Sequence, residues 1–170
     1  METGLRKVLM SFYKPEMIKW LEDNPSSFEE AVKLALSDEQ PYAWRSAWLL
    51  FDVIEKNDKR IKPHLKNFIK ALPNCRDGHK REILKILEKF TLTDTQEGML
   101  FDQCMNIWEQ VQAQPSVRYT AFRIILSITE RHPELKNEIP VLIQDHYLAT
   151  FSHGVKHSLN KMLKKKSILQ

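Results

Sequence analysis

Glycine is scarce in this chain, which has only 4 glycines among its 170 residues. No stretch is rich in glycine and serine, so the sequence lacks the composition of a flexible linker. It also lacks a glycine-rich phosphate-binding loop, a nucleophile elbow and a kinase signature. The scarcity of glycine predicts few turns and long helices, and the missing motifs lead us to predict no cofactor and no catalytic residue.

Cysteine is almost as rare, since the chain has only Cys75 and Cys104. Two cysteines 29 residues apart suggest neither a disulfide framework nor a cysteine-rich metal site. This usage predicts a reducing, cytoplasmic location. Cys104 lies in an apolar stretch and is predicted to be in the core. Cys75 lies in the predicted turn "LPNCRDGHKRE", where Arg76 and His79 could lower the pKa of its thiol. The simpler interpretation is a free turn cysteine without a function.

Long apolar runs and a strong charge of one sign are both missing. No run reaches the roughly 18 apolar residues of a bilayer-spanning helix, so we predict no membrane span. The segment "METGLRKVLMSFYKPEM" has charges on both sides of a short apolar stretch and no small-residue cleavage site. We therefore do not predict a signal peptide. A net charge of +4 and a pI near 9.0 permit acidic partners without requiring them.

The sequence does contain an internal repeat. The stretch "AWRSAWLLFDVIEK" at residues 43–56 returns in altered form as "VRYTAFRIILSITER" at 117–131. A shift of 74 residues places Pro41 on Pro115 without a gap. An intermediate copy, "HKREILKILEKF", and a shorter fourth copy, "GVKHSLNKMLKK", extend the series in steps of 36, 38 and 37 residues. Self-similarity at this period predicts stacked helical repeats.

Local signals favour two helices in each repeat. Apolar residues recur at spacings of three and four, as at Ala47, Leu50 and Ile54, and no segment alternates long enough to predict a strand. Pro41 and Pro115 stand where a helix begins, a position that needs no backbone donor. Capping-box spacing, in which side chains satisfy free amides of the first turn, occurs for Ser27 with Glu30 and for Asp94 with Glu97.

These signals predict four helical pairs and an N-terminal cap. The first helices of the pairs are predicted at 26–37, 60–72, 95–111 and 135–149. The second helices are predicted at 41–56, 78–91, 115–131 and 153–165. Two further helices, at 2–12 and 15–23, are predicted to cap the N-terminal end.

The second helices resemble the "VR..A...L" signature of HEAT repeats, most clearly at Val117-Arg118, Ala121 and Ile124-Ile125. The resemblance covers roughly residues 25–165. It implies an all-α fold, a right-handed α-α superhelix of about four HEAT-like helical pairs whose neighbours bury each other's apolar faces. It is specific for the architecture and implies no activity. We predict a single domain over 1–170, with capping helices in 1–24, repeats in 25–165 and a basic tail in 166–170.

In HEAT arrays the second helices line the concave surface and the first helices cover the convex one. The resemblance therefore lets the charge of each surface be counted from the sequence. The segments around the predicted second helices carry a summed charge of +7, and those around the first helices carry −4. We therefore predict a basic concave face that binds an acidic protein or peptide. Nucleic acid is the alternative partner, and solvated helix surfaces are the interpretation without a ligand. The predicted binding residues are Trp44, Arg45, Arg81, Lys85, Arg118, Tyr119, Arg123, Lys156 and His157.

Trp48 and Asp52 form the sharpest enzyme candidate. They are four residues apart and share a helix face, which resembles the Trp-x-x-x-Asp pairing of HEAT-like alkylpurine DNA glycosylases. The resemblance implies an aromatic residue facing the damaged nucleotide and a carboxylate stabilising a cationic sugar, with Arg81 or Arg118 on the phosphate or sugar. Trp48 also aligns with Phe122 in the repeat, which favours a core position. A DNA-binding protein related to these glycosylases is therefore our alternative function.

His153 and His157 are four residues apart, a spacing that can place two imidazoles on one metal ion, and His146 is nearby in sequence. No carboxylate completes an H-E-x-x-H motif, because residue 154 is glycine and residue 156 is lysine. We therefore predict surface histidines and no metal site. The identity of the partner and the oligomeric state stay open.

Overall fold

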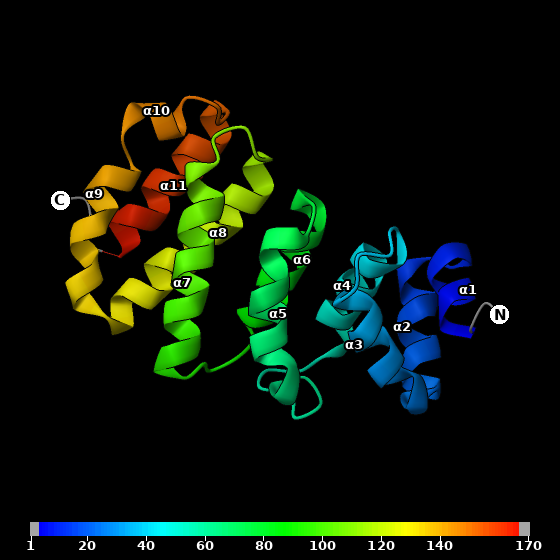
Figure 1. Ribbon diagram of the computed structural model, residues 1–170. Helices are drawn as coiled ribbons and strands as arrows, with labels where there is room; N and C mark the ends of the chain where they lie inside the picture. Colours follow the sequence, from blue (N-terminus) through cyan, green and yellow to red (C-terminus); the bar gives the residue numbers. More distant parts are fainter. Residues whose placement is uncertain (1–3, 167–170) are drawn as a thin grey trace. The chain divides into compact units, whose positions relative to one another are not determined.

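The computed structural model describes residues 4–166 (Figure 1). These residues form eleven α-helices and four short 3-10 helices, and they contain no β-strand. The predicted all-α class is thereby confirmed. None of the described helices has the combined length and apolarity that crossing a bilayer requires. The start of the predicted helix 2–12, and all of the predicted tail 166–170 except Lys166, lie outside the described residues.

The chain divides into two compact units, Met1–Leu92 and Thr93–Gln170. Packed helical pairs occur in both. In the first unit, α3 (Phe28–Ala35) packs on α4 (Tyr42–Val53). In the second unit, α7 (Asp94–Glu109) packs on α8 (Pro115–Arg131). The predicted pairing is therefore confirmed for these two helical pairs. A right-handed superhelix and a single domain over 1–170 stay predictions.

The first unit contains α4 as its central helix. The capping helices α1 (Gly4–Ser11) and α2 (Lys14–Asp23) both pack on α4. So does α6 (Asp77–Leu87), which also packs on α5 (Leu65–Ala71). Each of three 3-10 helices has a proline in its first turn, where no backbone donor is lost. They are Pro25–Ser27, Lys62–His64 and Leu72–Asn74.

The interior of the first unit follows the apolar repeat, with one exception. Ala47 and Leu50 are fully buried and Ile54 is nearly so. Removing one such leucine side chain from water stabilises the fold by about 2 kcal/mol. Trp48, which the repeat predicts to be a core residue, is only half-buried, whereas its counterpart Phe122 is fully buried. The two positions differ because Phe122 packs on a buried tryptophan in its own unit, while Trp48 lies at the surface of α4.

The second unit is built on a hairpin of its two longest helices. α8 begins at Pro115, as predicted, so the missing backbone donor of that proline costs nothing. Residues near the start of α7 bond to residues at the end of α8, so the two helices run antiparallel. The side chain of Trp108 on α7 is fully buried, and its ring stacks 4.4 Å from that of Phe122 on α8.

The N-terminal cap of α7 differs from the prediction by one residue. Thr93 is the N-cap, and its hydroxyl accepts a hydrogen bond from the backbone N–H of Gln96 at 3.3 Å. The side chain of Gln96 in turn accepts from the backbone N–H of Thr93 at 3.1 Å. Glu97 is thus not part of a capping box with Asp94. At α3, Ser27 makes no side-chain capping hydrogen bond, so that predicted cap is also absent.

The predicted first helix at 135–149 is broken. Pro140 has no N–H to donate to the carbonyl of Lys136, so a continuous α-helix cannot pass through this point. Gln144 then adopts an extended conformation and ends the segment. The next helix of more than one turn is α11 (His153–Lys165), whose N-cap is Ser152. In place of one helix the chain forms a 3-10 helix at Pro133–Glu138 and two single-turn helices, α9 (Ile139–Leu142) and α10 (Asp145–Leu148).

Candidate functional site

The nine residues predicted to bind a partner fall in both units. Trp44 and Arg45 lie on α4 and Arg81 and Lys85 on α6, all in the first unit. The other five lie in the second unit, where Arg118, Tyr119 and Arg123 are on α8 and Lys156 and His157 are on α11. The candidate surfaces are therefore described one unit at a time.

Arg118 lies in the interior of the second unit and is fully buried. Its Nε donates to the carbonyl of Trp108 at 2.9 Å, its Nη1 to the hydroxyl of Thr150 at 2.9 Å, and its Nη2 to the carbonyl of Tyr147 at 2.7 Å. The guanidinium also lies 4.5 Å from the ring of Phe151. Burial lowers the pKa of Arg118, but an arginine stays charged in proteins. We therefore omit Arg118 from the proposed contact residues.

Arg45 contacts backbone carbonyls at the end of the capping helix α1. Its Nε donates to the carbonyl of Leu9, and its Nη2 lies 3.4 Å from the carbonyl of Phe12. These carbonyls belong to the end of α1, which carries partial negative charge. Arg45 thus joins the first capping helix to α4.

Trp44 and Trp48 stack on the surface of α4, with ring centroids 5.8 Å apart and planes at 8°. The ammonium group of Lys14 lies 4.2 Å from the centroid of the Trp48 ring and pairs with the carboxylate of Asp52. The Trp48–Asp52 pair therefore exists on one helix face as predicted, and Lys14 contacts both of its members. Trp44 is half-buried, so its ring is available in part to a ligand.

The cations of α6 surround a buried carboxylate. The side chain of Glu82 is 1% exposed and accepts hydrogen bonds from Arg81 at 3.0 Å and from Lys85 at 2.7 Å. The ammonium of Lys85 also lies 4.1 Å from the ring centroid of Phe51. Glu82 offsets one of the two positive charges, so this part of the predicted basic face is less basic than the count of cations implies.

Helix α11 carries a basic surface with no opposing charge of its own. Its buried residues are Leu159 and Leu163, and the helix contains no aspartate or glutamate. We call the following residues the α11 basic face: Lys156, His157, Lys161, Lys164 and Lys165. Lys156 is half-buried and the other four are exposed. None of the four lysines forms an ion pair with a carboxylate in residues 4–166.

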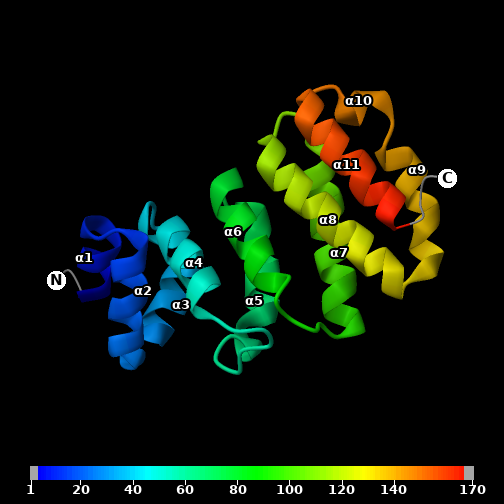
Figure 2. The same cartoon turned by 180° about the vertical axis from the view of Figure 1, so that it is seen from behind.

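The α11 basic face lies on the same unit as two more of the predicted residues. Figures 1 and 2 both show α11 alongside α8, and the ammonium of Lys166 pairs with Glu130 of α8 at 2.6 Å. Tyr119 and Arg123 on α8 are half-buried. The second unit therefore holds four of the predicted residues near its surface.

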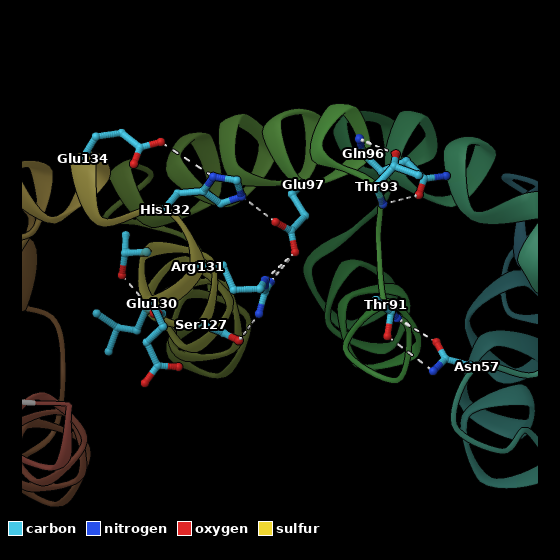
Figure 3. A network of polar contacts seen from close by, with 12 residues as sticks. Asn57, Thr91, Thr93, Gln96, Glu97, Ser127, Glu130, Arg131, His132 and Glu134 are labelled. Carbon is cyan, nitrogen blue, oxygen red and sulfur yellow. Dashed lines mark hydrogen bonds and ion pairs between the residues drawn. The ribbon is translucent and has the colours of Figure 1, made fainter.

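A polar cluster that we did not predict joins the two ends of the α7–α8 hairpin (Figure 3). The carboxylate of Glu97 accepts from Nε of Arg131 at 2.6 Å and lies 2.6 Å from Nε2 of His132. Nδ1 of His132 lies 3.6 Å from Glu134. Burial alone would raise the pKa of Glu97, but the hydrogen bonds from Arg131 and His132 bring that pKa below its usual value.

We did not predict this cluster because we had assigned Asp94 and Glu97 to a capping box at the start of the helix. Asp94 and Glu97 have the three-residue spacing of a capping box, but their carboxylates also share the first turn of α7. The basic pair Arg131-His132 ends the next helix, and an antiparallel hairpin with a short loop brings those two ends together. Asp94, Glu97 and His132 each offer an oxygen or nitrogen atom, and these three atoms lie within 4.8 Å of one another.

Cys75 does not have the environment of a reactive thiol. Burial raises the pKa of its thiol to about 11, although the nearby charge of Lys80 acts in the opposite direction. The Sγ atom lies 3.2 Å from the carbonyl of Ala71, to which the thiol donates. Arg76 and His79 therefore do not give Cys75 a lowered pKa, because desolvation outweighs nearby positive charge. Cys104 is buried, as predicted.

Comparisons with known proteins agree with this architecture. Neither the search of curated proteins nor the search of solved structures found a significant match. A family model described as HEAT repeat domain matches residues 2–166. This range includes the helical pairs of both units and the whole repeat pattern at 25–165, so the resemblance seen in the second helices is confirmed. The chain belongs to the HEAT repeat domain family.

Proposed function

We propose that this protein is a non-catalytic interaction module that binds an acidic segment of a partner protein on the α11 basic face. HEAT repeats generally mediate protein interactions or scaffolding, so we expect the partner to be a protein. The observation that carries the proposal is the charge of α11, which presents four lysines and His157 without a carboxylate on the same helix.

Within residues 4–166 these lysines form no ion pair, and this favours an external acidic partner. A single exposed ion pair is worth only about 0–1 kcal/mol. Several cations on one helix face nevertheless attract an acidic chain together and raise its association rate. In the first unit, by contrast, Lys14, Arg81 and Lys85 already have carboxylate partners within the chain. Arg123 and Tyr119 on α8 would add a guanidinium and a ring to the same contact.

Trp44 is the proposed anchor on the first unit. Its ring is half-buried and stacks on Trp48, so it is held in one orientation before a partner arrives. A rigid aromatic side chain loses little conformational entropy on binding and is a common hot-spot residue. We further propose a reducing, cytoplasmic location, which is supported by the two free cysteines.

Binding of defined probes tests the proposal. The probes are a fluorescent peptide rich in aspartate and glutamate, a neutral peptide of the same length, and duplex and single-stranded DNA. The test variant is Lys161→Glu/Lys164→Glu on α11. The matched control is Lys66→Glu/Lys70→Glu on α5, which makes the same charge change at two exposed lysines.

We expect the acidic peptide to bind more tightly than the neutral one, with at least about a tenfold loss for the α11 variant and little change for the α5 variant. Binding that both variants weaken equally would indicate net charge alone and would overturn the assigned surface. Tighter binding of DNA than of the acidic peptide, with a steep dependence on salt, would favour the nucleic-acid alternative. Absence of binding to any probe near physiological salt would also contradict the proposal.

A further inference from the structure

Three side chains at the open end of the α7–α8 hairpin have the arrangement of metal ligands. Asp94 and Glu97 lie on the first turn of α7, and His132 follows the last turn of α8. Their ligand atoms lie within 4.8 Å of one another. Zinc-to-ligand bonds of about 2.0–2.2 Å place neighbouring ligand atoms roughly 3–4 Å apart. The existing arrangement therefore needs only a small adjustment to hold a cation.

We propose that Asp94, Glu97 and His132 form a binding site for one divalent transition-metal ion, with Zn²⁺ as the favoured ion. Two carboxylates and one imidazole are a donor set that zinc accepts, and the imidazole disfavours Mg²⁺ and Ca²⁺, which prefer oxygen ligands. The cation would take the place of the proton between Nε2 of His132 and the carboxylate of Glu97, which are 2.6 Å apart.

The groups around the site support metal binding in two ways. Glu134 lies 3.6 Å from Nδ1 of His132, so a small movement of its side chain would let it accept a hydrogen bond from Nδ1–H and leave Nε2 for the metal. A carboxylate behind a ligating histidine is a common feature of zinc sites, because it orients the ring and increases its basicity. Arg131 holds the other oxygen of Glu97 at 2.6 Å and fixes the direction of that carboxylate.

The charge of the cluster also suits a divalent ion. Asp94, Glu97 and Glu134 contribute three negative charges, and Arg131 contributes one positive charge. These three carboxylates and the guanidinium have a net charge of −2, which one divalent cation neutralises. Glu130, the next carboxylate along α8, is already paired with Lys166 at 2.6 Å. The site is separate from the α11 basic face and does not depend on the proposed function.

Isothermal titration with Zn²⁺ after removal of metal by a chelator tests the proposal on the full chain. The key variant is Asp94→Asn, because Asp94 is exposed and its change to asparagine removes a ligand charge without changing the packing. The matched control is Asp102→Asn, an exposed aspartate on the same helix. A second control is His157→Gln, which removes one histidine of the His153/His157 pair on α11.

We expect wild type to bind one Zn²⁺ per chain, and both control variants to bind it unchanged. Asp94→Asn and Glu134→Gln should weaken binding by about 10–100-fold, and His132→Gln should weaken it further. With Co²⁺ as the probe, the visible absorption of a metal–imidazole complex should disappear in His132→Gln. Circular dichroism of each metal-free variant shows whether it is folded. Loss of Zn²⁺ binding in His157→Gln, or equal affinities of Asp94→Asn and Asp102→Asn, would overturn the site, as would no binding to wild type.

Discussion

The guanidinium of Arg118 on α8 donates to the backbone carbonyl of Trp108 on α7 at 2.9 Å, and lies 4.7 Å from the centroid of the Trp108 ring. One buried cation thus contacts both the backbone and the side chain of the facing helix. Its Nη1 donates to Thr150, in the loop before α11, and its Nη2 donates to the carbonyl of Tyr147 on α10. Arg118 is therefore expected to determine the stability of the second unit.

Replacing Arg118 with methionine should lower the free energy of unfolding by about 3 kcal/mol, because the buried carbonyl of Trp108 and the part-buried carbonyl of Tyr147 lose their donor. Urea denaturation followed by circular dichroism measures the change. Lys161→Met, a substitution on the exposed side of α11, is the control and should change stability by less than about 0.5 kcal/mol. Equal effects of the two substitutions would contradict a structural role for Arg118.

Glu97→Gln should destabilise the α7–α8 hairpin by about 2 kcal/mol in the presence of a chelator. The substitution keeps the shape of the side chain but removes the charge that Arg131 and His132 contact. Glu109→Gln, at an exposed position near the other end of α7, serves as the comparison. Hydrogen exchange at the last turn of α8 gives a local readout, and unchanged protection there would contradict this prediction.

The loop after α4 should give the first unit a stability that depends on acid pH. Hydrogen bonds from Arg60 are the main reason that the pKa of Asp58 falls to about 2 from its ordinary 3.8. A carboxylate with a depressed pKa stabilises the fold above its unfolded pKa, and this contribution disappears as pH falls through the folded value. The urea midpoint of wild type should therefore exceed that of Asp58→Asn at pH 5, and the gap should narrow between about pH 4 and pH 2. A gap that stays constant over this range would contradict the prediction.

Cys75 should resist alkylation at neutral pH in the folded protein. A thiol with a pKa of about 11 is almost entirely protonated at pH 7.5, and the thiolate is the reactive form. A Cys104→Ala variant isolates the reaction of Cys75 with iodoacetamide, and mass spectrometry measures its rate. We expect slow labelling that accelerates as pH rises, and rapid labelling in urea. Labelling in the folded state as fast as in urea would contradict the raised pKa.

The sequence predicted the regular helices well because each one has an apolar stripe that a neighbour must bury. The 74-residue repeat located α4 and α8, and its residues Ala47 and Ala121 are both fully buried. The segment after Pro133 was predicted less well. Its apolar spacing resembles that of a helix, but Pro140 removes a hydrogen bond that the spacing does not reveal.

The candidate binding residues and the Glu97 cluster were harder to predict. Whether a charged side chain is exposed depends on the residues that contact it in the folded protein. Arg118 was grouped with surface cations, although its spacing of three and four to Ala121 and Phe122 places it on the buried side of α8. That spacing was a usable signal. The contact of Glu97 with His132 joins residues 35 apart, and only the antiparallel packing of two helices brings them together.

The contacts of Glu97 have a consequence for the topology of the hairpin. The chain already connects α7 to α8 through the turn that follows Glu109, and Glu97 with Arg131 and His132 connects them again at the opposite end. The two helices and their two connections therefore form a closed ring. One connection is the covalent turn, and the other is the set of non-covalent contacts of Glu97. Neither helix can unwind from its outer end, or slide along the other by one turn, without breaking the charged contacts of the buried Glu97 carboxylate. The register of the hairpin is thus determined at both ends, and not by apolar packing alone.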